Sequence, residues 1–253
     1  MNHTKINRRQ MIQSTAVAAG VAAALQATSS ATRAATPKVR LKKGDVILFQ
    51  GDSITDARRN RKTESRPNDT SGLGDGYPVL VAGGLLRDHA KLGLKILNRG
   101  ISGHKVPDLA KRWRKDTLDL KPALLSILIG VNDFWHKMAG RYDGTVATYR
   151  TGFAALLKQT REALPDTPFV ICEPFALRCG AVNDSWHPEF DQRRAAAKEV
   201  AREADALWVP FQTMFDEAIT AGTKPEYWAR DGVHPTLAGH ALMAETWRKA
   251  VGV

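Results

Sequence analysis

The chain has 253 residues and a formal net charge of +11, with 37 Lys and Arg against 26 Asp and Glu. That length is enough for one well-buried α/β domain. The basic side chains are spread along the sequence, which indicates a solvated surface and argues against a nucleic-acid partner.

The first 35 residues differ in composition from the rest of the chain. They contain basic residues, no acidic residue and an Ala-rich run over 16–25. That run is about as long as the apolar part of a signal peptide and too short to span a bilayer. Arg8 and Arg9 resemble a twin-arginine export signal, although Asn7 stands where the consensus has Ser or Thr. The sequence therefore predicts export to the periplasm or the exterior, and a disordered basic tail is the alternative interpretation.

Removal of residues 1–35 leaves residues 36–253 as a single predicted domain. Four basic residues and no acidic ones are lost with the leader, so the formal charge falls from +11 to +7. The remaining sequence has no apolar stretch long enough for a membrane helix, so no stable membrane insertion is expected.

Short apolar runs alternate with longer helical patterns through the predicted domain. The predicted strands are 46–49, 94–97, 124–129, 169–172 and 207–209. The predicted helices are 77–89, 106–115, 146–164, 188–204, 211–221 and 237–251. Near-continuous apolar strands are typical of a parallel sheet covered on both faces. The alternation predicts a doubly wound α/β/α sandwich, a three-layer fold with a five-stranded parallel sheet.

The last predicted helix has a clear apolar face and a clear start. Its face is predicted to consist of Leu237, Ala241, Ala244, Trp247 and Val251. Thr236 precedes the helix, where its side chain can cap the first turn.

Polar motifs follow the predicted strands at the points where each strand ends. They are Gly51-Asp52-Ser53-Ile54-Thr55, Asn98-Arg99-Gly100-Ile101-Ser102-Gly103, Gly130-Val131-Asn132-Asp133 and, before the last helix, Asp231-Gly232-Val233-His234-Pro235. Open α/β sheets bind ligands at the carboxyl ends of their strands. The long stretch 56–76, which has no predicted helix or strand, begins at the same edge and is expected to contribute to the site.

In this order, the four motifs resemble the consensus blocks of the SGNH (GDSL-like) hydrolases, and the resemblance extends from Gly51 to Pro235. It implies a flavodoxin-like α/β/α fold and a serine esterase activity. An α/β-hydrolase is disfavoured, because the chain has no Gly-x-Ser-x-Gly nucleophile elbow.

Ser53, His234 and Asp231 are the predicted catalytic residues. A serine hydroxyl is a weak nucleophile until a neighbouring base takes its proton, and His234 is the obvious base. Asp231, three residues earlier, can orient the histidine ring and stabilise its charged form. Asp52 is predicted to bond its own turn rather than to act as a catalytic acid.

The resemblance also implies three donors to the oxyanion of the intermediate. They are the backbone N–H groups of Ser53 and Gly103 and the side-chain amide of Asn132. Gly100 is the alternative to Gly103, which we prefer because the family motif places this donor in the Ser-Gly pair.

Trp135 and His136 follow Asn132 and are predicted to line the acyl or sugar pocket, with a surface position as the alternative. The other histidines of the domain carry less weight. His187 is a weaker pocket candidate, and His89, His104 and His240 are expected at the surface.

No cofactor is predicted. The sequence contains no His/Asp/Glu cluster at metal-ligand spacing and no Gly-rich phosphate loop, so no metal is expected either. Cys172 and Cys179 are predicted to form either a short-loop disulfide or two free thiols, at least one of them in the core.

The predicted substrate is a small-acyl ester, most simply an O-acetyl group on a carbohydrate such as a polysaccharide. Polar and aromatic residues near the motifs suit a sugar: Asn68, Asp69, Trp135, His136 and Trp186. The sequence shows no large apolar lid of the kind a long-acyl lipase needs. A lysophospholipase or acyl thioesterase is the alternative, and a catalytically silent glycan-binding protein is a third. The sequence indicates no oligomeric state.

Overall fold

The computed structural model describes residues 39–253, which lie within one compact unit, Thr36–Val253. The predicted signal peptide, residues 1–35, lies outside the described residues. The sheet consists of β1 (Val46–Gly51), β2 (Lys95–Asn98), β3 (Leu124–Leu128), β4 (Phe169–Cys172) and β5 (Leu207–Val209). All neighbouring strands are parallel, in the order β2-β1-β3-β4-β5. The predicted strands and the doubly wound fold are confirmed.

The long helices also agree with the prediction. They are α3 (Tyr77–Asp88), α4 (Val106–Asp116), α6 (Val146–Ala163), α7 (Glu189–Glu203), α8 (Phe211–Thr220) and α10 (Leu237–Val251). Shorter helices that the sequence pattern did not predict are α1 (Ser53–Asp56), α2 (Thr70–Leu73), α5 (Val131–Met138) and α9 (Pro225–Trp228). The stretch 56–76 is thus partly helical rather than structureless.

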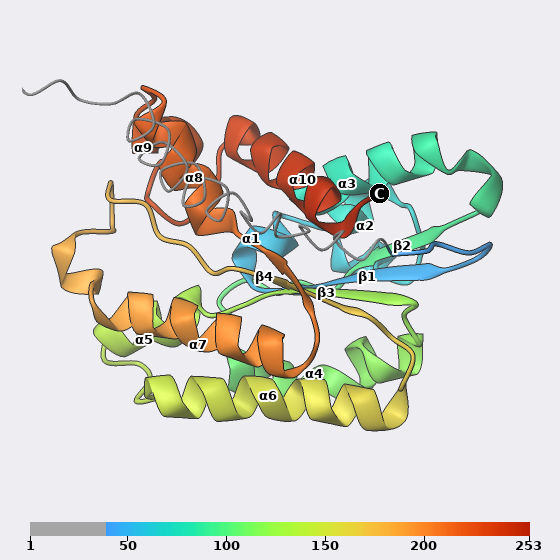
Figure 1. The fold of residues 1–253 in the computed structure, drawn as a ribbon, viewed down its shortest axis with the longest axis horizontal. Coiled ribbons are helices and arrows are strands. Elements are labelled where there is room, and N and C mark those ends of the chain that lie inside the picture. The colour runs from blue at the N-terminus through green and yellow to red at the C-terminus, as the bar shows by residue number, and fades with distance from the viewer. Residues whose placement is uncertain (1–38) are drawn as a thin grey trace, which may run out of the picture. The chain divides into compact units, whose positions relative to one another are not determined.

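Two apolar layers cover the sheet, one on each face. Helices α3, α8 and α10 pack on one face, and α4, α6 and α7 pack on the other (Figure 1). Alternate residues of β1 point to opposite layers: Ile47 and Phe49 to the first, Leu48 to the second. Because neither face of the sheet meets water, the strands read as near-continuous apolar runs, and Ser126 in the middle of β3 is a buried exception whose hydroxyl accepts the Trp247 Nε1–H.

The buried face of α10 differs from the predicted face. Trp247 is buried and its ring lies 5.4 Å from that of Phe49, as the pattern requires. Leu237, however, is 75% exposed, and His240, predicted at the surface, is only 8% exposed. The first turn of α10 therefore turns its apolar side chain outward. Thr236 caps the helix as predicted, since its hydroxyl accepts the N–H of Gly239 at 3.2 Å.

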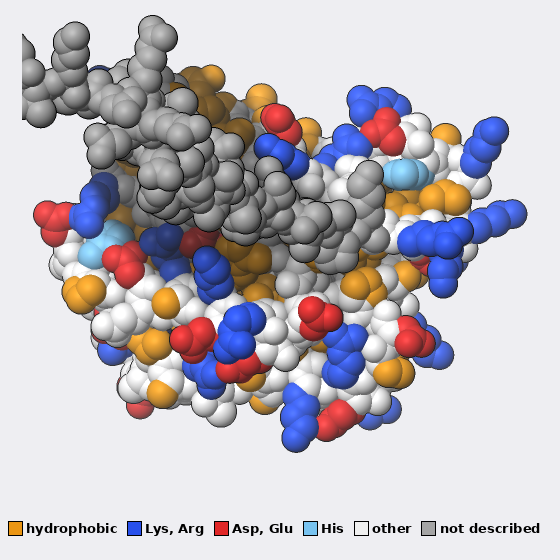
Figure 2. All heavy atoms as spheres, in the orientation of Figure 1, with side chains coloured by type: hydrophobic (Ala, Val, Ile, Leu, Met, Phe, Trp, Pro, Cys, Tyr) orange, Lys and Arg blue, Asp and Glu red, His pale blue; other side chains and the backbone are white. Residues whose placement is uncertain are grey.

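The surface carries basic and acidic side chains mixed together. On the face seen in Figure 2, Lys and Arg side chains of the described part alternate with Asp and Glu rather than forming one basic patch. Within residues 39–253, no helix combines the length and apolar character needed to cross a membrane.

Cys172 and Cys179 are both buried and both free. The structure thus favours the second of the two predicted alternatives. Burial raises the pKa of the Cys172 thiol to about 12. In the same described range, no group of three or more His, Cys, Asp or Glu side chains is arranged to hold a metal ion.

Candidate active site

The polar motifs meet where the strand order reverses. β1 lies between β2 and β3, and Gly51 at the end of β1 pairs with Leu128 at the end of β3. Ser53 and Asn132 follow these two ends at the start of α1 and α5. This position between two strands whose connections leave in opposite directions is the usual ligand site of a doubly wound sheet.

Ser53, His234 and Asp231 form a continuous chain of hydrogen bonds. The Ser53 Oγ lies 2.9 Å from Nε2 of His234, and Nδ1 of the same ring lies 2.7 Å from Oδ2 of Asp231. The other carboxylate oxygen of Asp231 accepts the backbone N–H of His234 at 2.7 Å and that of Val233 at 3.0 Å. Burial raises the pKa of Asp231, but these hydrogen bonds outweigh burial, so the pKa lies below its ordinary value. Asp231 is therefore ionised and fixed beside the ring.

Two further candidate donors follow the neighbouring strand ends. Gly103 has φ of +79°, and in the described part of the chain its backbone N–H meets no protein acceptor. The N–H of Gly100, by contrast, donates to Oδ1 of Asn98 at 2.8 Å. Asn132 is 5% exposed, and its Nδ2 donates to the backbone oxygen of His104 at 3.2 Å, which leaves its second N–H free to bond elsewhere. Of the two candidate glycines, Gly103 has the available donor.

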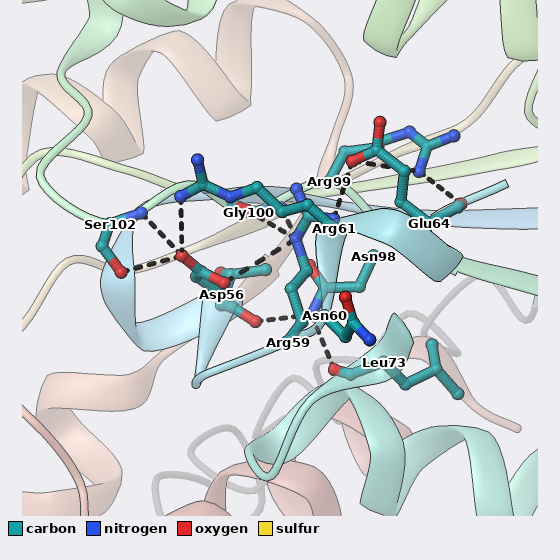
Figure 3. Close-up of polar contacts among 12 residues, drawn as sticks. Asp56, Arg59, Asn60, Arg61, Glu64, Leu73, Asn98, Arg99, Gly100 and Ser102 are labelled. Atoms are coloured by element: carbon teal, nitrogen blue, oxygen red, sulfur yellow. Dashed lines mark hydrogen bonds and ion pairs between the residues drawn. The ribbon is translucent and has the colours of Figure 1, made fainter. Parts of the chain in front are cut away.

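A buried polar network holds the loop that contains Gly103. Oδ2 of Asp56 accepts both the N–H of Ser102, at 2.9 Å, and its hydroxyl, at 2.8 Å (Figure 3). Nε of Arg59 donates to the backbone oxygen of Gly100 at 2.7 Å. Nδ2 of Asn98 donates to the backbone oxygen of Leu73 at 2.8 Å. The stretch 56–76 therefore supports the strand-end loop from behind, mainly through polar groups.

The charged end of this network is also buried. Arg59 pairs with Glu64 at 2.9 Å, and Nη1 of Arg99 donates to the backbone oxygen of Glu64 (Figure 3). Burial raises the pKa of Glu64, but the hydrogen bond from Arg59 and the charge of Arg99 outweigh it and lower the pKa overall. The network thus retains a carboxylate between two guanidinium groups.

Two carboxyl groups lie beneath the site rather than in it. Asp52 is fully buried and its Oδ1 accepts the N–H of Ile54 at 3.0 Å, so it caps α1 as predicted. Asp133 is also buried and accepts the N–H of Val106 at 3.2 Å. Burial raises the pKa of each to about 7, and the charge of Asp133 adds to the effect on Asp52.

Trp135 and His136 lie beside the reacting groups. The Trp135 ring centroid is 6.0 Å from that of His234 and 5.5 Å from that of Trp186. A Cβ built on Gly103 would lie 3.9 Å from Cε1 of His136. Burial, together with the charge of Lys105, lowers the pKa of His136.

Three residues that the sequence suggested for sugar binding have structural roles instead. Asn68 bonds the backbone of β2, through Leu94 and Ile96, at 2.8 Å each. Asp69 caps α2 by accepting the N–H of Gly72. Trp186 is 1% exposed and packs in the core. The burial of Trp186 contradicts its predicted contact with a sugar, and the bonds of Asn68 and Asp69 give those two residues a role in local structure.

A cleft of about 550 Å³ opens beside Ser53 and His234. Its far wall contains Arg58 and Asp75, from the two ends of the stretch 56–76, and His240 of α10. The length of the 56–76 stretch indicated part of this wall in advance. Nothing in the sequence indicated His240.

The chain belongs to the GDSL-like lipase/acylhydrolase family, whose model matches residues 49–242. It is therefore a carboxylic ester hydrolase, and the resemblance seen in the motifs is confirmed.

The relatives include a protein of known activity. The chain is 33% identical to the acetylxylan esterase of Geobacillus stearothermophilus over 218 residues, covering 85% of this chain and 97% of that protein. A crystal structure of that esterase matches with a TM-score of 0.75 at 32% identity, over 84% of this chain and 96% of that one. Other structures of it are catalytic mutants with a serine, an aspartate or a histidine replaced by alanine. A GDSL-like lipase from Parabacteroides merdae matches with a TM-score of 0.82 at 50% identity, over 85% of this chain and 99% of that one.

Proposed function

We propose that this chain is a carbohydrate O-acetyl esterase that works through an acyl-enzyme on Ser53. The observation that carries the proposal is the unbroken hydrogen-bond chain from Ser53 through His234 to Asp231, with bonds of 2.9 and 2.7 Å. The acetylxylan esterase to which the chain is similar supports the substrate class. In that relative the aspartate and histidine of the catalytic mutants are three positions apart, as Asp231 and His234 are here.

In the proposed first step, Nε2 of His234 takes the proton of Ser53 while Oγ attacks the carbonyl carbon of the ester. The bond between the carbonyl carbon and the ester oxygen breaks, and that oxygen leaves with the sugar as it receives the proton from His234. Asp231 accepts the Nδ1–H of the ring throughout, which holds the tautomer and stabilises the imidazolium. The products of this step are the free sugar and acetyl-Ser53.

The negative charge that develops on the carbonyl oxygen needs donors that are already in position. We assign this role to the N–H groups of Ser53 and Gly103 and to Nδ2 of Asn132. The N–H of Ser53 is among the N-terminal N–H groups of α1 that have no intrahelical acceptor. Removing one such donor typically costs ~10²–10³ in rate.

The second step repeats the first with water in place of the serine hydroxyl. His234 takes a proton from water, the hydroxyl attacks the acetyl carbon, and the proton passes to Oγ of Ser53 as acetate leaves. The cycle thus consumes one ester and one water and regenerates the Ser53 hydroxyl.

Replacing the serine tests the mechanism. Ser53→Ala should lose hydrolysis of p-nitrophenyl acetate by at least ~10³-fold, since the nucleophile is gone, and should keep the melting temperature of the native chain. Ser185→Ala, which alters an exposed serine that does not line the cleft, is the matched control and should keep full activity. Retained activity in Ser53→Ala would contradict the mechanism.

The length of the acyl chain tests the substrate class. Turnover should fall steeply from acetyl to octanoyl p-nitrophenyl esters, and the enzyme should release acetate from acetylated xylan. Equal or faster octanoyl turnover would support a lysophospholipase or a thioesterase instead. Tight glycan binding without hydrolysis of any ester would support a silent binding protein.

We also propose that residues 1–35 direct twin-arginine export. The support is the Arg8-Arg9 pair before an Ala-rich run in a segment without acidic residues. Replacing both arginines with lysine should keep the precursor in the cytoplasm, whereas Arg33→Lys in the same leader should not. Unchanged export of the double variant would exclude this route.

A further inference from the structure

The two sides of Ser53 receive different parts of an ester. The proposed oxyanion donors Gly103 and Asn132 must face the carbonyl oxygen, whereas the leaving alcohol oxygen must come within reach of Nε2 of His234. The alcohol therefore lies over His234. The cleft of about 550 Å³ is lined by His234 itself and by Pro235 and His240, which follow it in the chain.

We infer that this cleft is the alcohol subsite, and that Arg58, Asp75 and His240 bind hydroxyl groups of the sugar that carries the ester. The inference rests on the proposed function and adds to it the side chains that select the alcohol.

Arg58 is presented to the cleft by an unusual backbone. Ala57 and Arg58 both have positive φ, 41° and 62°, which residues with a Cβ rarely adopt. The N–H of Ala57 donates to the backbone oxygen of Ser53 at 2.9 Å, and the N–H of Asp75 donates to the backbone oxygen of Ala57 at 2.8 Å. The strained turn is therefore tied directly to the serine, and strain of this kind concentrates at functional sites.

Arg58 forms an exposed ion pair with Asp75. Nη2 of Arg58 lies 2.9 Å from Oδ2 of Asp75, with the two side chains 85% and 65% exposed. A pair this exposed contributes little to folding stability. It does, however, present donors and an acceptor to the cleft that both side chains line.

His240 completes the wall from α10. Its Nδ1 accepts the N–H of Tyr77 at 3.1 Å, so the proton of the neutral ring is on Nε2. Burial, with the charge of His234 adding to it, lowers the pKa of His240 to about 4, which keeps the ring neutral in ordinary buffers. No described residue accepts a bond from Nε2, so this N–H is available to a ligand in the cleft that His240 lines.

The wall is closely packed behind these three side chains. A Cβ on Gly76 would lie 2.6 Å from Cβ of Ala57 and 3.1 Å from Cε1 of His240. A side chain at position 76 would thus push the two parts of the wall apart, and glycine is what lets them meet. The His240 ring, which is held in this way, loses little entropy when a ligand arrives.

The chemistry of the wall fits a neutral polyol. Each sugar hydroxyl both donates and accepts, the Asp75 carboxylate accepts, and Arg58 and His240 donate. Leu237, 75% exposed on the same cleft, offers an apolar contact to the C–H face of a sugar ring. A long acyl chain would have to dehydrate Arg58 and Asp75 without replacing their hydrogen bonds, which is unfavourable. The opposite charges of the pair also give no preference for an anionic headgroup.

Two acetate esters with different alcohols separate sugar binding from catalysis. Arg58→Ala, Asp75→Asn and His240→Asn should each lower kcat/KM by about tenfold on acetylated methyl β-xyloside, the size expected for one lost hydrogen bond. On p-nitrophenyl acetate, whose alcohol has no sugar hydroxyl groups, the loss in each variant should be at least about fivefold smaller than on the xyloside. In His240→Asn the new Oδ1 can still accept the N–H of Tyr77, and thermal melting verifies the fold. His240→Gln returns an N–H near the Nε2 position and should recover part of the xyloside activity.

Arg150→Ala is the matched control, because it breaks an exposed ion pair with Glu199 outside the cleft. It should leave both activities unchanged. Native xyloside activity in all three cleft variants would overturn the inference and leave the proposed function standing. Equal losses on both esters would also overturn it, because these side chains would then serve the catalytic groups. If the native chain cleaves p-nitrophenyl acetate but no sugar acetate, the proposed substrate class fails, and the inference fails with it.

Discussion

Asp56 offers a direct test of how the oxyanion donors are held. Its Oδ2 accepts two hydrogen bonds from Ser102, at 2.9 and 2.8 Å, and the carboxylate is only 4% exposed. Ser102 immediately precedes Gly103, so any shift of its backbone moves the proposed donor. Asp56→Asn keeps one acceptor oxygen but removes the charge and replaces the other oxygen with an N–H₂ group.

The expected loss can be worked out from these contacts. Hydrogen bonds to charged groups contribute ~1.5–3 kcal/mol each and neutral ones ~0.5–1.5, so the change weakens two bonds by ~1 kcal/mol apiece. The variant should therefore lose roughly 2 kcal/mol of unfolding free energy. If the loop shifts by about 1 Å, kcat should fall by ~10²-fold, equivalent to ~2.7 kcal/mol, with little change in KM.

The assay is steady-state hydrolysis of p-nitrophenyl acetate, with urea unfolding measured in parallel. Asp69→Asn is the matched control, since Asp69 lies in the same stretch but caps α2 by accepting the N–H of Gly72. It should lose stability and keep kcat. A double-mutant cycle of Asp56→Asn with Asn132→Ala should be non-additive, because both changes act on one oxyanion. A folded Asp56→Asn variant with kcat within twofold of the native chain would refute the reasoning.

Further predictions concern stability, the loop and the thiols. Burial raises the pKa of Asp52 to about 7, so its protonated form stabilises the fold at low pH, and that contribution is lost as pH rises toward 7. Between pH 5 and pH 7, the free energy of unfolding of the native chain, measured in urea, should therefore fall relative to that of Asp52→Asn by up to ~1.4 kcal/mol per pH unit. If the two free energies change in parallel with pH, the prediction is contradicted. Gly103 has φ of +79°, and a Cβ there would have no neighbour closer than 3.9 Å. Gly103→Ala should therefore fold with ~1–2 kcal/mol less stability and lose activity, because the strained backbone displaces the donor N–H. Full activity would argue against Gly103 as an oxyanion donor. Cys172 and Cys179, both buried and free, should react with Ellman's reagent only after unfolding, and a single disulfide by mass spectrometry would disprove this.

The local pattern of apolar residues was sufficient to predict most of the strands and long helices. The strands could be predicted because both faces of the sheet are buried, which leaves near-continuous apolar runs such as residues 124–128. Helix α5 (Val131–Met138) was missed because its first turn carries Asn132 and Asp133, which read as a turn. What stabilises this helix is tertiary: Asp133 accepts the N–H of Val106, 27 residues away.

In the candidate site too, some residues could be predicted from sequence motifs and others only from tertiary contacts. Ser53 and His234, which belong to motifs, are joined by a hydrogen bond of 2.9 Å, and the roles of Gly103 and Asn132 stay predictions. His240 could not be found, because its partner, the N–H of Tyr77, is 163 positions away, and only that contact turns a helix-surface histidine into a buried one. Leu237 was assigned to the core for the same reason, since periodicity alone does not show where a helix's first turn leaves the protein.

The hydrogen bond between Ser53 and His234 joins residues 181 positions apart. The nucleophile stands at the end of the first strand, and its base belongs to the segment that leads into the last helix. Contacts of such long range form late, because the chain between them must first be ordered. Esterase activity should therefore return only in the final phase of refolding, after the far-ultraviolet circular dichroism has recovered. A chain cut before α10 could hold a largely formed sheet and still be inert.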